Sequence, residues 1–161
     1  MKKVFSILMV ALMGLALCTM FSCNNEWVDL GLPSGTKWKN ANEVNVADTV
    51  YNFYTYDEAV AAFGDALPTK EQWEELKDNC QWTWNDSGYT VTGPNGHSIV
   101  LPAAGYRSCC GSVFNVGSSG LYWSSAPCGA EYAWTLYFDS VHVHVGNSYR
   151  CYGYSVRLVQ D

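Results

Sequence analysis

Alternation of apolar and polar residues predicts short strands along most of the chain. Residues 89–92 alternate, a Gly-Pro-Asn-Gly turn follows, and residues 98–101 form an apolar run typical of a buried strand. The same pattern predicts strands at residues 27–32, 37–39, 50–54, 121–125, 134–138, 141–145 and 154–159. No helical pattern is convincing after Gln81.

Two helices are predicted by capping boxes, which pair Thr55 with Glu58 and Thr69 with Gln72. In a capping box each of the two side chains satisfies a backbone N–H that the first helical turn leaves free. The first helix is expected to end at Gly64. Two early helices followed by antiparallel strands predict an α+β fold.

The N-terminus has the pattern of an export signal. A short basic start precedes an apolar run over residues 4–17, which is too short to span a bilayer comfortably. The small residue Ser22 directly before Cys23 resembles the lipobox of bacterial lipoproteins. That resemblance implies a signal peptide at residues 1–22 and a lipid on Cys23, which anchors without spanning. Cys18 is a weaker candidate, and plain secretion is the alternative.

Residues 24–161 are predicted to form a single domain. The chain carries a net charge of −6, which argues against nucleic acid as a partner because phosphate binding needs a basic face. Aromatic residues make up 15% of the chain, as much as all charged residues together. This composition fits a β-rich domain with aromatic side chains to spare for a binding surface.

The cysteines after Cys23 do not form an obvious disulfide framework. They are Cys80, Cys109, Cys110, Cys128 and Cys151. Their odd number leaves at least one unpaired within the chain. No Cys-x-x-Cys pair supports a zinc ribbon or a thioredoxin-like site.

Six ordered motifs carry a family resemblance. They are VDLGLPSGT (28–36), LPTKEQWEEL (67–76), GPNG (93–96), LPAAGYR (101–107), YWSS (122–125) and YSVRLV (154–159). Together they resemble the major paralogous domain surface lipoproteins of gut-type Gram-negative bacteria. The resemblance implies a C-type-lectin-like fold, similar also to formylglycine-generating enzymes, and a place at the outer membrane or cell surface.

The last third also resembles the variable proteins of diversity-generating retroelements, in which adenines of Asn codons are rewritten. Such codons can become Tyr, Cys, Ser, His, Asp or Phe, but not Lys, Gln, Glu, Met or Trp. After residue 107 only Trp123, Glu131, Trp134 and Gln160 are outside the reachable set. The resemblance therefore implies a variable ligand-binding region at residues 106–154. It also makes Cys109, Cys110, Cys128 and Cys151 random draws, not bridges.

Strand alternation predicts which of these side chains face outward. Val141, Val143 and Val145 are expected inside with His142 and His144 presented, and Leu136 and Phe138 inside with Thr135, Tyr137 and Asp139 outside. Exposed tyrosines on rigid strands form a paratope-like surface. The candidate ligand-binding residues are Cys109, Phe114, Leu121, Cys128, Tyr132, Thr135, Tyr137, Asp139, His142, His144, Tyr149, Cys151 and Tyr152.

The sequence gives little support for a metal-binding or catalytic site. His142, His144 and Asp139 suit a transition metal, but two histidines alternating on a surface strand are a blander explanation. Trp84-Asn85-Asp86 matches a calcium tripeptide of animal lectins at the wrong place in the chain. No Gly-x-Ser-x-Gly elbow is present. We therefore expect no catalytic residues, no metal and no cofactor.

The sequence thus predicts a surface-displayed, receptor-like or adhesin-like lipoprotein with a retroelement-diversified C-terminal region. Its expected partner is a protein or glycan on another cell, a phage or a host surface. The alternative is a non-diversified surface lipoprotein that binds a fixed glycan or takes part in envelope or fimbria-like assembly.

Overall fold

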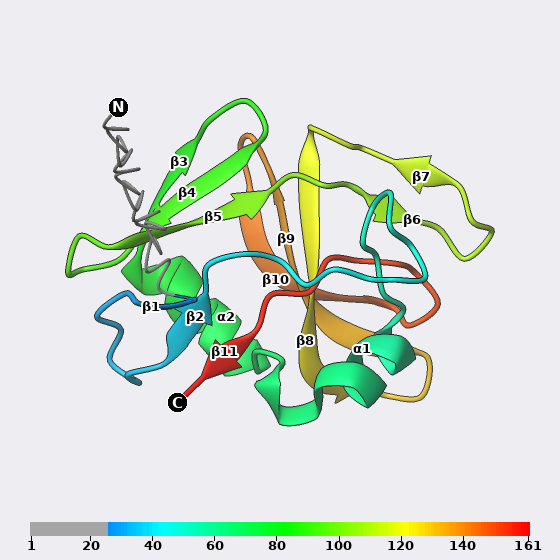
Figure 1. Cartoon of the computed structure of the whole chain (residues 1–161), viewed down its shortest axis with the longest axis horizontal. Helices are drawn as coiled ribbons and strands as arrows, with labels where there is room; N and C mark the ends of the chain where they lie inside the picture. The colour runs from blue at the N-terminus through cyan, green and yellow to red at the C-terminus, as the bar shows by residue number, and fades with distance from the viewer. Residues whose placement is uncertain (1–25) are drawn as a thin grey trace, which may run out of the picture.

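The computed structural model describes residues 26–161, in which two α-helices accompany four small antiparallel sheets (Figure 1). The arrangement is α+β, as the sequence predicts. The predicted signal peptide (residues 1–22) and the predicted lipidation site, Cys23, lie outside the described residues. Within residues 26–161 no helix is both long enough and apolar enough to cross a membrane.

Both predicted helices are confirmed, and their boundaries follow from local hydrogen bonds. They are α1 (Tyr56–Phe63) and α2 (Lys70–Asn79), with the 3-10 turn η1 (Gly64–Ala66) after α1. The Thr55 hydroxyl accepts from the Glu58 N–H, and the Glu58 carboxylate accepts from the Thr55 N–H. Thr69 and Gln72 repeat the exchange at α2. Gly64 ends α1 with φ at +50°, where a residue with a Cβ is strained.

The strands lie in four sheets. The first holds β1 (Trp27–Asp29), β2 (Lys37–Lys39) and β11 (Val159–Gln160); the second β3 (Gln81–Trp84), β4 (Gly88–Thr92) and β5 (Ser98–Pro102); the third β8 (Ser119–Cys128), β9 (Tyr132–Asp139) and β10 (Val143–Tyr149); the fourth β6 (Tyr106–Arg107) and β7 (Val113–Phe114). Residues 50–54, predicted as a strand, form a turn with one bridge at Tyr54. The predicted strand at 154–159 is largely irregular and contributes only its last residue to β11.

The third sheet separates two apolar cores. Tyr122, Leu136 and Phe138 enter the first core, which also packs on α2, whereas Leu121 and Trp123 enter the second, beside α1. Figure 1 shows α2 and α1 on opposite sides of β8. Neighbouring strand residues point to opposite faces, so both faces of β8 are covered and its first six residues are all buried.

This two-sided burial corrects the outward position predicted for Thr135, and it buries Leu121, which the sequence made a candidate ligand-binding residue. Thr135 is 3% exposed and Leu121 is 8% exposed, because the face that they share carries the second core where solvent was expected. The inward position predicted for Val141 is also wrong. Its side chain is 77% exposed, because the residue lies at the tip of the β9–β10 hairpin and outside β10. Leu136 and Phe138 are buried, as predicted.

Candidate functional site

Five aromatic side chains in a row at the surface form the strongest candidate site. We call Phe114, Tyr106, Tyr152, Tyr149 and Tyr132, in that order, the aromatic face. Successive ring centroids lie 5.5, 5.7, 6.1 and 4.5 Å apart. The Phe114 and Tyr149 side chains are exposed and the other three half-buried. The row therefore offers aromatic edges and tyrosine hydroxyls to a ligand on a single surface.

The aromatic face rests on buried aromatic residues of the second core. The rings of Tyr106 and Tyr152 lie 6.2 and 6.0 Å from the Tyr154 ring, which in turn lies 4.4 Å from Trp123. Burial raises the pKa of Tyr154 to about 12, so its hydroxyl stays protonated and pairs with the Ser148 Oγ at 2.5 Å. This support holds the rings of Tyr106 and Tyr152 in fixed orientations, which reduces the conformational entropy that is lost when a ligand binds.

A disulfide fastens the two loops that carry the row. Cys109 and Cys151 are bonded, with Cα atoms 5.1 Å apart across 42 residues of sequence. Beside them, Arg107 and Gly153 exchange backbone hydrogen bonds of 2.9 and 2.8 Å. The prediction that these two cysteines are not bridged is wrong, because the β6–β7 hairpin folds back onto the 149–153 turn and brings them together. Cys80, Cys110 and Cys128 are free thiols.

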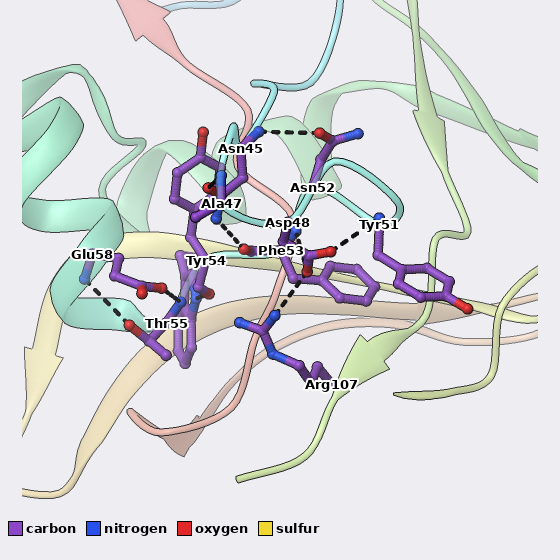
Figure 2. Close-up of polar contacts among 11 residues, drawn as sticks. Asn45, Ala47, Asp48, Tyr51, Asn52, Phe53, Tyr54, Thr55, Glu58 and Arg107 are labelled. Carbon is purple, nitrogen blue, oxygen red and sulfur yellow. Dashed lines mark hydrogen bonds and ion pairs between the residues drawn. The ribbon is translucent and has the colours of Figure 1, made fainter. Parts of the chain in front are cut away.

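The loop before α1 is attached to these two loops through Arg107. Its guanidinium Nη1 lies 2.8 Å from the Asp48 Oδ2, and Asp48 also accepts from the Tyr51 and Phe53 N–H groups (Figure 2). Figure 2 shows Arg107 reaching toward Asp48 from the strand below the loop. The loop before α1 is thereby tied to the β6–β7 hairpin.

The β9–β10 hairpin carries a second group of predicted site residues, most of them polar, at the end of β9 opposite Tyr132. The Asp139 carboxylate accepts from the N–H groups of Val141 and His142, each at 2.8 Å, and these bonds lower its pKa to about 2. The Tyr137 hydroxyl donates to the same carboxylate, and the His144 ring lies 4.8 Å from Tyr137. The ionised Asp139 carboxylate therefore holds the backbone of the hairpin tip in place through these hydrogen bonds. Among residues 26–161 no three His, Cys, Asp or Glu side chains gather as metal ligands.

The structure brings some predicted site residues together and separates others. Phe114, Tyr132, Tyr149 and Tyr152 lie in the aromatic face, and Cys109 and Cys151 brace it. Tyr137, Asp139, His142 and His144 lie along the β9–β10 hairpin, the two histidines exposed as predicted. Cys128 is half-buried at the end of β8. Sequence reasoning missed Tyr106, because its segment matches a scaffold motif; its place at the start of residues 106–154 was the available signal.

A pocket opens beside the aromatic face. It measures about 600 Å³ and is lined by Thr55, Asp57, Ala130, Glu131, Tyr149, Arg150 and Cys151. Arg150 forms an ion pair with Asp57 and lies 4.8 Å over the Tyr56 ring. A second pocket, of about 820 Å³, lies at the β1 end of the molecule and contains none of the predicted site residues.

Comparison with known proteins finds a family. Residues 73–159 match the model of a family described as a domain of unknown function (DUF8237). No curated protein and no solved structure matches the chain. The matched segment runs from α2 to β11 and includes the whole aromatic face.

Proposed function

The chain belongs to this family of unknown function, and from the geometry of the site we propose that it is a surface-displayed ligand-binding lipoprotein. The observation that carries the proposal is the aromatic face: five aromatic side chains at the surface, oriented by a buried aromatic layer and braced by a disulfide. A surface of this kind binds by contact area and hydrogen bonds and needs no chemistry.

The family resemblance of the sequence extends the proposal to the fold and to the way in which the binding residues would vary. We propose a C-type-lectin-like domain whose region 106–154 is diversified by a retroelement. Phe114, Tyr132, Tyr149 and Tyr152 support it, because each is a residue type that a rewritten Asn codon can encode and each lies at the surface. Because Cys109 and Cys151 form a disulfide, we propose that they belong to the constant scaffold and not to the diversified positions.

The structure sharpens the experiment that tests diversification. We would sequence the locus and its flanks deeply in a population grown from one cell. Variation is expected in the codons of exposed positions such as Phe114, Tyr149 and His144, at adenines of a nearby template copy. The codons of Leu121 and Thr135 are the matched control, since their side chains are buried and should stay uniform.

The alternative is a surface lipoprotein that is not diversified and binds one fixed glycan or assembles into an envelope structure. A uniform population without a template copy or a neighbouring reverse transcriptase would favour this alternative. Equal variation at Leu121 and Thr135 would instead remove the link between the aromatic face and diversification.

A further inference from the structure

We propose that residues 44–51, here called the valine loop, form a second part of the binding surface, and that the ligand is therefore a protein with an apolar patch. This inference rests on the proposed ligand-binding function, which it narrows to one class of partner.

The valine loop exposes several large apolar side chains to solvent. The side chains of Val44, Val46 and Val50 are 67%, 89% and 76% exposed, and Tyr51 follows at 39%. Single exposed apolar residues are ordinary on soluble proteins, whereas contiguous exposed apolar patches mark interaction sites.

The loop holds this conformation through polar groups that it turns inward. The Asn45 amide donates to the Phe53 carbonyl at 2.5 Å, and its Oδ1 accepts from the Ala47 N–H at 3.0 Å (Figure 2). The Tyr54 hydroxyl donates to the Val44 carbonyl at 2.6 Å. Asn45 is only 8% exposed. The polar Asn45 side chain thus lies inside, while the three valines lie in solvent. A loop ordered in this way loses little entropy when its valines are covered.

The valine loop is continuous with the aromatic face. Arg107 joins Asp48 of the loop to β6, and its backbone pairs with Gly153 in the turn that follows Tyr149 and Tyr152. A Cβ built on Gly153 would lie 3.1 Å from the Phe53 Cβ, so the turn also packs against Phe53, two residues beyond the loop. Arg107 and Asp48 neutralise each other. The junction therefore carries no net charge that would repel an apolar surface.

The chemistry of valine decides the class of partner. A saccharide is held by stacking on aromatic rings and by hydrogen bonds to its hydroxyl groups, and an aliphatic side chain offers neither. Valine gains binding free energy by burial against other apolar groups, at about 25 cal/mol per Å². The loop lies outside residues 106–154, so it would contact every ligand in the same way while the aromatic face varies.

The test uses substitutions that leave the interior untouched. A phage-displayed random dodecapeptide library is selected on the full wild-type protein, and an array of neutral and acidic oligosaccharides is screened in parallel. Val46→Asp and Val50→Asp place a charge in the loop, and Val100→Asp is the matched control because Val100 is 47% exposed on β5, outside the valine loop, the aromatic face and the β9–β10 hairpin. Unchanged urea midpoints establish that all three variants fold.

The selected peptides are expected to lose at least about tenfold in affinity for the two loop variants and to keep it for the control. Peptides that bind the loop variants like wild type would overturn the inference. So would an oligosaccharide that needs Val46, or a wild-type dimer in sedimentation that Val46→Asp dissolves. Tyr149→Ser and Tyr152→Ser report separately on the proposed function: peptides sensitive to these two but not to the loop variants would leave the aromatic face standing alone.

Discussion

Arg157 is the only charged residue that is buried in the described part of the chain. The whole residue is 1% exposed, and neutral oxygens accept hydrogen bonds from its guanidinium. Nε and Nη2 donate to the Asn42 Oδ1 at 2.9 and 2.7 Å, Nη1 donates to the Lys39 carbonyl at 2.7 Å, and Nη2 also donates to the Val100 carbonyl at 2.6 Å. Burial lowers the pKa of Arg157, but a guanidinium remains charged at neutral pH. One side chain thus fastens the C-terminal segment to β2 and β5.

Lysine should not replace Arg157, because its ammonium keeps the charge but cannot reproduce the planar fork of donors. Arg157→Lys is expected to lower the free energy of unfolding by about 3 kcal/mol, measured by urea denaturation. The exposed Lys37→Met is the control and should change it by less than about 0.5 kcal/mol. Equal stability of Arg157→Lys and wild type would show that the fork is dispensable.

At the scale of elements, the Cys109–Cys151 bridge ties the β6–β7 hairpin to the turn after β10. Replacing both cysteines by serine frees a long loop in the unfolded chain, and should cost about 2–4 kcal/mol of unfolding free energy. The near-UV circular dichroism of the tyrosines should weaken as well, because the loops that carry Tyr106 and Tyr152 lose their brace. Cys110→Ser, at an exposed free thiol next to the bridge, should change neither. A double variant as stable as wild type would mean that the Arg107–Gly153 pairing alone holds the loops.

The same elements show what sequence can and cannot predict. α1 and α2 were predictable because a capping box joins residues three apart, and the β4–β5 hairpin because its turn lies between its strands. The burial of Thr135 was not, since alternation tells which residues share a face but not whether that face is covered. Phe114, Tyr149 and Tyr152 could be named by type and region. Their assembly into one row needed long-range contacts, and so did the disulfide.

At the scale of the whole molecule, the two ends differ in kind. The described chain begins at Glu26, beside β1, and Figure 1 places β6 and β7 at the opposite end of the long axis. β6 and β7 carry Tyr106 and Phe114, so this part of the aromatic face lies far from Glu26, the first described residue. A lipid on Cys23 would therefore hold the β1 end at the membrane and present the aromatic face outward.

This orientation depends on Cys23 being the lipidated residue, which cell fractionation can decide. In a Gram-negative host fed a labelled fatty acid, the wild-type protein is expected to carry label and sediment with membranes. Cys23→Ser should lose the label and move to the soluble fraction, because the lipid on this cysteine is the only expected attachment to the membrane. Cys18→Ser is the matched control and should behave like wild type. If Cys18→Ser lost the label instead, the anchor would precede the domain by five more residues and fix its orientation less. An unlabelled wild-type protein would mean plain secretion, and the aromatic face would then have no preferred direction in which to meet its ligand.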